Sequence, residues 1–354
     1  MIKEVSIADR LVGDGHPIFL IAEVAQAHDG SLGMAHAYID AAAEAGVDAI
    51  KFQTHIADQE STLEEPFRVK FSVQDSTRYD YWKRMEFTTD QWVGLSEHAR
   101  DKGIIFLSSP FSVAAVQLLD KLGVPAWKVG SGEFKSDDLI SAMIDTGKPV
   151  LYSTGMSKWS EIDAVVDFFY GKSHPLVLFQ CTSMYPTRAE SIGINVMNQF
   201  RSKYDCPLGL SDHSGDIYSS LLAAANGANI IEAHITFDKR MFGPDVSASL
   251  TIDQFKFLTK AFYEFDKILN NPVDKDKMAD ELSHSRDLFT KSIAPSRVLE
   301  RGTILDEKML LPKKPGTGIP FSKKHMIIGK RLVKSVHPNH LIKWDDIEGG
   351  SNHA

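Results

Sequence analysis

Two histidines lie at the ends of two successive apolar runs of this chain, Pro207–His213 and Ile230–Thr236. If both runs are strands of one parallel sheet, His213 and His234 lie on the same rim of that sheet, where α/β proteins build their sites. A single histidine there would more often be a satisfied structural residue. A pair of imidazoles can instead hold a divalent metal ion, so we predict that these two residues are metal ligands.

Two lysines, Lys51 and Lys128, lie inside apolar strand-like runs. A buried ammonium group is costly without an anionic partner. That partner is either a core carboxylate, such as Glu23 or Glu133, or an anionic ligand. Three serines at other predicted strand ends would donate hydrogen bonds to the same anion: Ser109, Ser131 and Ser211. Such a set would suit a phosphorylated carboxylic acid.

The composition excludes several classes of function. The 354 residues carry a net charge of -8, which argues against a nucleic-acid-binding surface. No apolar run reaches the length of a membrane span, and the first residues lack the apolar core of a signal peptide. The two cysteines, Cys181 and Cys206, require no disulfide framework. We therefore predict a cytoplasmic enzyme with no nucleic-acid or membrane partner.

Short β-rich runs alternate with segments of helical period, which predicts a parallel sheet. A Gly-rich dinucleotide motif is missing after every run, so we predict a closed (β/α)8 TIM barrel and not an open doubly wound sheet. The expected strands are 17–24, 49–54, 104–108, 126–130, 150–153, 176–181, 208–213 and 230–235. The expected helices are 34–45, 90–102, 113–122, 160–170, 219–225 and 252–269.

The pattern changes after residue 270, where a polar segment with a proline begins. We predict a barrel domain over residues 1–270, a linker over 271–284 and a small β-rich domain over 285–354. The small domain contains a weak internal echo between residues 303–309 and 341–347. Within the barrel, residues 57–86 are rich in charges and aromatic side chains, and we predict a long loop beside the site.

Motifs at the predicted strand ends resemble those of the sialic acid synthase family, in the same order along nearly the whole chain. They are Ala22-Glu23 through Gly30, Lys51-Phe52-Gln53-Thr54, Lys128 through Glu133, Ser153-Thr154-Gly155-Met156, Gln180 through Pro186 and Gly243-Pro244-Asp245. The stretch Lys314 through Ile319 is similar to the antifreeze-like (SAF) domain of that family, a small domain of the β-clip type.

This resemblance implies an enzyme that condenses phosphoenolpyruvate with an N-acylated hexosamine. Water attack at C2 and C–O cleavage would give a nine-carbon 2-keto sugar acid and phosphate. The resemblance also implies a divalent metal, manganese first, with magnesium or cobalt as alternatives. It further implies a domain-swapped homodimer, in which the SAF domain of one subunit covers the barrel mouth of the other.

The resemblance also implies roles for single residues. Phosphoenolpyruvate would be surrounded by Lys51, Ser109, Lys128, Ser131, Ser183, Tyr185 and Ser211. The sugar would contact Glu23, Gln53, Tyr185, Asp245 and Lys314. His213 and His234 would hold the metal. Lys51 and Lys128 would offset the charge of the leaving phosphate. Glu23 or Glu133 would be the acid/base carboxylate, and the sequence does not choose between them.

Three departures from the family pattern affect the sugar half of the site. The loop after the first strand reads Gln26 through Gly30, Gln-Ala-His-Asp-Gly, where many members have Asn-His-Asn-Gly. Val246 stands where histidine is frequent, and Lys314 stands where bacterial members commonly have arginine. Lysine keeps the charge but loses the planar fork. The choice among N-acetylmannosamine, its 6-phosphate and a diacetamido-dideoxy hexose therefore stays open.

Two other functions compete with this interpretation. A sibling phosphoenolpyruvate-dependent synthase would make a shorter 3-deoxy-ulosonate phosphate, but such barrels normally lack the SAF tail. A non-catalytic carbohydrate-binding protein of the same fold would be expected to lose strand-end lysines or histidines. Neither kind of residue is lost here.

Overall fold

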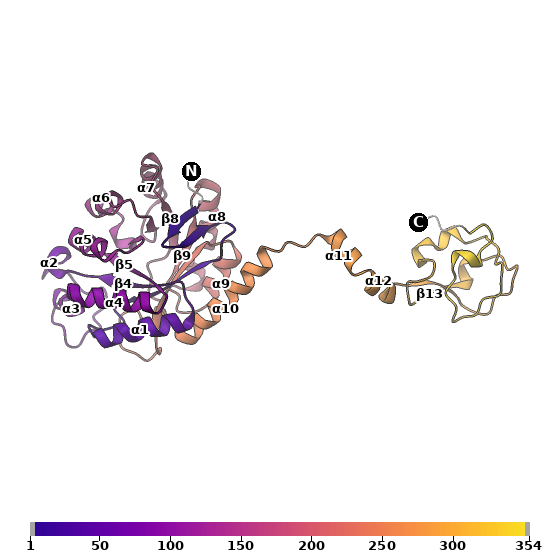
Figure 1. Cartoon of the computed structure of the whole chain (residues 1–354), viewed down its shortest axis with the longest axis horizontal. Coiled ribbons are helices and arrows are strands. Elements are labelled where there is room, and N and C mark those ends of the chain that lie inside the picture. Colours follow the sequence, from indigo (N-terminus) through magenta and orange to yellow (C-terminus); the bar gives the residue numbers. More distant parts are fainter. Residues whose placement is uncertain (1–3, 351–354) are drawn as a thin grey trace. The chain divides into compact units, whose positions relative to one another are not determined.

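The computed structural model describes residues 4–350 of the chain. Contacts within the chain divide it into two compact units, of which the first ends at Asn270 and the second begins at Asn271. The two units are shown in Figure 1 and are described separately below. Between residues 4 and 350, no helix is long and apolar enough to cross a membrane.

Within the described part of the first unit, eight parallel strands form a nearly closed barrel. They pair in the order β5-β4-β3-β10-β9-β8-β7-β6, and β5 and β6 at the two ends contact each other. The short strand β11 (Ser249–Thr251) pairs with β10. The barrel strands are β3 (Phe19–Ala25), β4 (Ala49–Thr54), β5 (Ile105–Pro110), β6 (Trp127–Val129), β7 (Val150–Ser153), β8 (Leu176–Cys181), β9 (Leu208–Asp212) and β10 (Ile230–Thr236). The predicted TIM barrel is confirmed.

Helices surround these strands, as Figure 1 shows. Their ends follow from local chemistry. Ser31 caps the start of α1 and Gly46 ends it in the left-handed conformation, while Thr88 and Thr251 form capping boxes at α4 and α10. The helices are α1 (Leu32–Ala45), α2 (Ala57–Glu60), α3 (Arg78–Met85), α4 (Thr89–Asp101), α5 (Val113–Leu122), α6 (Asp137–Asp145), α7 (Trp159–Gly171), α8 (Ile194–Lys203), α9 (Tyr218–Ala225) and α10 (Ile252–Leu269).

The sequence pattern missed several of these elements. Strands β4, β7 and β8 and helices α5 and α10 have the predicted bounds. Helices α6 and α8 were not predicted, and residues 57–86 contain α2 and α3 where a loop was expected. Also missed was an N-terminal hairpin of β1 (Glu4–Ile7) and β2 (Arg10–Gly13), whose strands are only four residues long.

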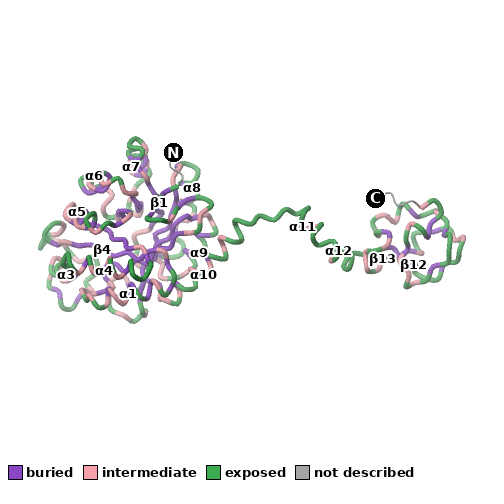
Figure 2. Tube along the Cα trace, viewed as in Figure 1, coloured by how far each residue is buried: buried purple, intermediate pink, exposed green. Residues whose placement is uncertain are grey.

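The core of the first unit has two parts. A large apolar cluster fills the layer between the strands and the helices. A smaller cluster fills the barrel interior, where early strand residues such as Phe19, Leu151 and Ile230 pack with Val5 and Val12 of the hairpin. Each fully buried side chain of this size contributes about 1.5–3 kcal/mol. The hairpin therefore packs on the amino-terminal end of the barrel, and in Figure 2 the strands are mainly buried.

The second unit is small and has its own apolar cluster. It begins with the helices α11 (Lys275–Glu281) and α12 (Ser283–Phe289), followed by the antiparallel pair β12 (Ser292–Pro295) and β13 (Leu310–Lys313). Isolated bridges and turns make up most of the rest. The cluster contains Ile293, Leu299, Leu305, Leu310, Ile319, Ile327, Leu332, Val336, Ile342 and Ile347. Both halves of the predicted echo include one short 3-10 helix, Glu307–Met309 and Trp344–Asp346.

Candidate active site

Four charged side chains form a buried cluster at the carboxyl ends of the barrel strands. Lys51 on β4 lies 2.6 Å from Glu23 on β3 and 3.7 Å from Glu232 on β10. Lys128 on β6 lies 3.4 Å from Glu232. The four side chains are between 1% and 6% exposed. Each lysine therefore has a carboxylate partner within the protein, and Glu232 pairs with both lysines.

Glu232 was not among the predicted site residues, because it lies inside a run that was read only for its apolar residues. Side chains two positions apart on a strand point to the same face. Glu232 is two positions before His234, so this alternation was the pattern that would have found it. Both residues are almost completely buried.

Hydroxyl groups complete the cluster. The Lys51 Nζ donates to Ser109 Oγ at 3.1 Å, and the Lys128 Nζ donates to Ser153 Oγ at 2.6 Å. Ser211 Oγ donates to Glu232 Oε1 at 3.2 Å. Ser109 and Ser211 were predicted for the anion site, whereas Ser153 was not. The hydroxyls are thus placed where an anion that binds the lysines would meet them.

The two carboxylates of the cluster hold protons with different affinity. Burial raises the pKa of Glu23 to about 7, with Glu232 adding to the effect and Lys51 opposing it. Burial alone would also raise the pKa of Glu232, but Lys128 and Lys51 outweigh it and hold the value at about 2. Carboxylates whose pKa values are pushed apart in this way are suited to separate acid and charge-stabilising roles. Glu133, the other predicted acid/base residue, is half-buried and accepts a hydrogen bond from Ser136 at 2.6 Å.

His213 and His234 lie together next to this cluster. Their ring centroids are 5.3 Å apart, and each residue is 5% exposed. The Nδ1 of His213 lies 3.1 Å from the Thr182 carbonyl oxygen, to which a protonated Nδ1 would donate. That tautomer leaves the lone pair of Nε2 available for a metal ion. Burial and the neighbouring His213 hold the pKa of His234 well below its usual range, so this imidazole is neutral.

The donor set therefore fits an open metal site. Burial lowers the pKa of His213, but Cys181, the Thr182 carbonyl and Glu232 together raise it more, so a metal ion would bind this imidazole in competition with a proton. Among residues 4–350, no group of three or more histidine, cysteine or acidic side chains is arranged to hold a metal ion. Two imidazoles would leave coordination positions to water or substrate, as in catalytic metal sites.

A cavity of about 770 Å3 opens at this end of the barrel. Seven of the predicted site residues line it: Gln53, Ser131, Glu133, Ser183, Tyr185, His234 and Asp245. The others from the first unit are buried behind this lining: Glu23, Lys51, Ser109, Lys128, Ser211 and His213. Lys314 belongs to the second unit, where its Nζ lies 5.3 Å from the ring centroid of Phe289, and its part in the site stays a prediction.

Ser131 and Ser183 lie beside a glycine that leaves room for them. The Gly155 N–H donates to Ser131 Oγ at 3.1 Å. A Cβ atom added at Gly155 would lie 2.5 Å from Ser183 Oγ, 2.6 Å from Ser131 Oγ and 2.9 Å from Cys181 Sγ. Because that space is free of a side chain, the two hydroxyls and the backbone N–H form a small cradle of hydrogen-bonding groups.

The segment between β4 and α3 contributes an arginine that was not predicted. Arg68 lies 3.0 Å from Asp245, and its guanidinium is 4.3 Å from the ring centroid of Tyr185. Arg84 on α3 connects this segment to the loop after β3, because it forms ion pairs with Asp75 of the segment at 2.8 Å and with Asp29 of that loop at 2.7 Å. Arg68 and Asp245 are 177 residues apart in the sequence, so no local pattern could have found this pair.

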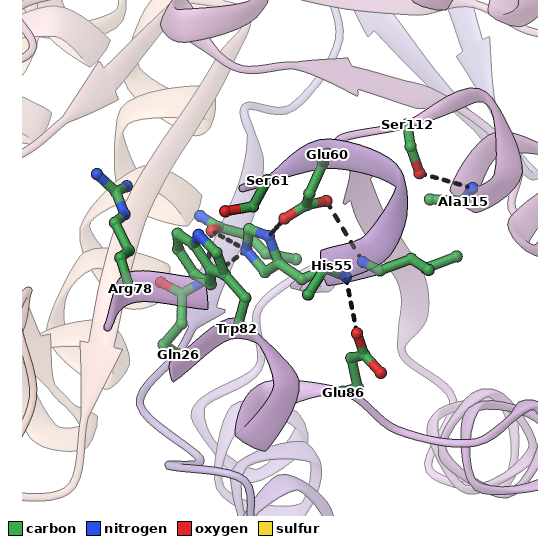
Figure 3. Close-up of polar contacts among 12 residues, drawn as sticks. Gln26, His55, Glu60, Ser61, Arg78, Trp82, Glu86, Ser112 and Ala115 are labelled. Carbon is green, nitrogen blue, oxygen red and sulfur yellow. Dashed lines mark hydrogen bonds and ion pairs between the residues drawn. The ribbon is translucent and has the colours of Figure 1, made fainter. Parts of the chain in front are cut away.

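A second unpredicted feature is a chain of hydrogen bonds around His55, shown in Figure 3. The imidazole is stacked between Trp82 and Phe111, with ring centroids 3.9 and 4.4 Å away. Its Nδ1 bonds Glu60, and its Nε2 lies 2.9 Å from the amide nitrogen of Gln26. The same Gln26 nitrogen donates to the amide oxygen of Gln53. The amide nitrogen of Gln53 in turn donates to Glu23 at 2.9 Å. The cavity wall is thereby connected to the buried carboxylate.

Comparisons with known proteins agree on one family. The NeuB family model matches residues 38–274, and the SAF domain model matches residues 290–348. The N,N'-diacetyllegionaminic acid synthase of Legionella pneumophila is 32% identical over 344 residues, which cover 95% of this chain and 96% of that protein. The N-acetylneuraminate-9-phosphate synthase of Homo sapiens is 32% identical over 339 residues, covering 94% and 93%.

The fold is also found in a solved structure. The crystal structure of N-acetylneuraminic acid (sialic acid) synthetase from Leptospira borgpetersenii, in complex with citrate, matches with a TM-score of 0.71. The sequence identity is 31%, and the match covers 80% of this chain and 96% of that one.

Proposed function

The chain belongs to the NeuB family, and we propose that it is a nonulosonic acid synthase that condenses phosphoenolpyruvate with an N-acylated hexosamine. The products are a nine-carbon 2-keto sugar acid and phosphate. The observation that carries the proposal is the buried cluster of Lys51, Glu23, Glu232 and Lys128 beside two facing imidazoles. The named synthases among its relatives support it.

The two lysines would bind the anionic groups of phosphoenolpyruvate. Each lysine is already desolvated and held by a hydroxyl, Ser109 for Lys51 and Ser153 for Lys128, so little reorganisation is needed when the anion enters. The hydroxyls of Ser131 and Ser183 in the cradle would bind the remaining oxygens, while the Gly155 N–H positions Ser131. When the C–O bond breaks, the same lysines would stabilise the negative charge on the phosphate.

Glu23 would be the acid/base residue. In the reaction, C3 of phosphoenolpyruvate attacks the aldehyde carbon of the open-chain sugar, water adds at the resulting cationic C2, and the C–O bond to phosphate breaks. Glu23, with its pKa raised to about 7, can accept the proton of the attacking water near neutral pH. Gln53, which donates to Glu23 at 2.9 Å, would orient that carboxylate.

His213 and His234 would hold a divalent metal, for which we propose manganese. When bound, such a metal polarises a carbonyl oxygen. Glu232 pairs with both lysines and also interacts electrostatically with both imidazoles. Its negative charge would allow the two lysines and the metal ion to lie close together in a buried site.

The direct test is phosphate release from phosphoenolpyruvate. The protein would be stripped of metal, reloaded with manganese and given N-acetylmannosamine, its 6-phosphate or a diacetamido-dideoxy hexose. Manganese-dependent release with one sugar would support the proposal and identify the product. A protein that binds phosphoenolpyruvate but releases no phosphate with any sugar would contradict it.

The cradle gives a first prediction. Gly155→Ala should weaken phosphoenolpyruvate binding about 10- to 100-fold, because the added methyl group overlaps the two serine hydroxyls at a cost of about 1–3 kcal/mol. Titration calorimetry with phosphoenolpyruvate measures the effect. Gly94→Ala is the control, since an added Cβ there meets no atom within 4 Å. Equal affinity of the two variants would remove the cradle from the binding site.

The second unit gives another prediction. We propose a domain-swapped homodimer in which Lys314 of the partner subunit reaches the sugar. Lys314→Ala should then raise the KM for the sugar about tenfold, as expected for a lost charge-assisted hydrogen bond, and leave the KM for phosphoenolpyruvate unchanged. Lys308→Ala, an exposed lysine of the same unit, is the matched control. Unchanged sugar kinetics in the Lys314 variant would exclude this role.

A further inference from the structure

The wall of the cavity carries more negative than positive charge. Its acidic residues are Glu60, Glu65, Glu133, Asp138 and Asp245, and its basic residues other than histidine are Arg68 and Arg78. The excess is three negative charges among the lining residues. A cavity lined by charge of one sign concentrates ligands of the other sign and disfavours those of the same sign.

Both guanidinium groups of the wall are already paired. Arg68 lies 3.0 Å from Asp245 and stacks on Tyr185 at 4.3 Å. Arg78 lies 3.2 Å from Glu65, with its guanidinium 5.0 Å from the centroid of the Trp82 ring. A phosphate group that entered the cavity would share either arginine with the carboxylate already paired to it, so neither guanidinium supplies an uncompensated positive charge.

Two carboxylates of the wall have no such compensation. Glu133 accepts a hydrogen bond from the neutral Ser136, and Asp138 is exposed in the first turn of α6. In the part of the chain that the structure describes, no ion pair joins either residue to a lysine or arginine. These two side chains therefore act as uncompensated negative charges on the cavity wall.

The remaining cations of the site do not line the cavity. Lys51 and Lys128 are buried behind it, and each is paired with Glu23 or Glu232. In the proposed function, these two lysines bind the anionic groups of phosphoenolpyruvate. A manganese ion at His213 and His234 would add two positive charges, and Lys314 of the partner subunit would add one. Phosphoenolpyruvate bound beside the metal would bring about 2.5 to 3 negative charges, so negative charge remains in excess where the sugar binds.

The rest of the wall suits a neutral polar ligand. Gln26, Gln53 and Ser112 offer amide and hydroxyl groups that can bond sugar hydroxyls and an acyl carbonyl. Trp82 and Phe111 provide aromatic surface, and Figure 3 shows Gln26 and Trp82 close together beside His55. Sites of this kind combine an apolar wall with a few polar groups that fix orientation.

We propose that the sugar substrate is uncharged, an N-acylated hexosamine without a phosphate ester. This inference rests on the proposed function and selects among its possible substrates. A phosphate monoester carries about −1.5 to −2 charges at pH 7 and would meet the net negative wall. Uncharged N-acetylated hexoses avoid that repulsion and keep the hydrogen bonds.

The test compares kcat/KM for N-acetylmannosamine and a diacetamido-dideoxy hexose with kcat/KM for N-acetylmannosamine 6-phosphate, using the full-length manganese-loaded protein. We expect kcat/KM for the better uncharged sugar to exceed kcat/KM for the 6-phosphate by about 100-fold or more. A 6-phosphate used equally well or better would overturn the inference and leave the synthase function standing. Absence of turnover with all three sugars would overturn the synthase function and this inference with it.

A pair of variants tests the charge argument itself. Asp138→Asn should raise the ratio of kcat/KM for the 6-phosphate sugar to kcat/KM for the uncharged sugar about threefold at low ionic strength, because one nearby repulsive charge is removed. Asp137→Asn, in the same exposed turn of α6, is the control, since Asp137 does not line the cavity. The same response in both variants, or none in either, would contradict an electrostatic selection by the wall.

Discussion

Lys51→Met is expected to abolish phosphate release, by about 10³-fold or more, and to lower the free energy of unfolding at about pH 8 by about 1–2 kcal/mol. The activity should be lost because, in the proposed function, the variant removes a charge that contacts the anionic substrate. The stability is lost because Glu23 stays 1% exposed with its 2.6 Å ion-pair partner gone. Steady-state phosphate assays and chemical denaturation measure the two effects, and exposed Lys121→Met is the matched control.

The stability loss in this variant should depend on pH. Burial already raises the pKa of Glu23 to about 7 in the folded protein, and Lys51 lowers it. Without Lys51 the folded-state pKa rises further above the unfolded value. A group with a raised folded pKa contributes stability at low pH that is lost as the pH rises through that pKa. The deficit should therefore be small at about pH 5 and large at about pH 8.

A double variant separates the two effects. Lys51→Met combined with Glu23→Gln should recover most of the stability, because the substituted amide carries no charge and Glu232 keeps its pairing with Lys128 at 3.4 Å. It should recover none of the activity. If the single variant were as stable as the wild type at about pH 8, the buried ion pair would contribute nothing to the fold. If it also kept its activity, Lys51 would have no part in anion binding.

The second large effect is expected at the two imidazoles. His213→Ala and His234→Ala should each lower manganese-dependent turnover by about 10³-fold, since a Lewis acid contributes several kcal/mol of charge stabilisation. Each should also weaken manganese binding in titration calorimetry, which is a readout independent of turnover. The barrel should stay folded, because the apolar clusters do not contain either residue.

His98→Ala serves as the control for the imidazole variants, since His98 lies on α4 and bonds Asp40 and His36 away from the cavity lining. It should bind manganese as the wild type does. Full activity of the His213 variant, or unchanged manganese affinity in both variants, would remove the metal assignment.

The sequence predicted the barrel well because its strands are buried runs at regular intervals with helical segments between them. Strand-end positions could then be read directly, and Lys51, Lys128, His213 and His234 do lie together at one end of the barrel. Short elements were less predictable. The four-residue strands of the hairpin and the weakly apolar α8 carry too little pattern to be separated from loops.

The predicted site residues of the first unit lie on the barrel strands or in the loops that follow them. Glu232 escaped because its run was read only for its apolar residues and its terminal histidine, and its role depends on lysines from two other strands. Arg68 escaped because tertiary contacts alone bring its segment to Asp245. Each lysine does pair with a core carboxylate. In the proposed function, these carboxylates would hold the lysines until phosphoenolpyruvate binds.

The hairpin of β1 and β2 has a consequence for kinetics. Because it packs on the interior cluster at one end of the barrel, ligands would enter and leave by the opposite mouth. Phosphoenolpyruvate, bound at the buried lysines, would then lie deeper than the sugar. The synthase would then bind its substrates in a compulsory order, phosphoenolpyruvate first and the sugar second. Excess sugar would slow turnover, because sugar bound in the mouth of the barrel would block the empty phosphoenolpyruvate site.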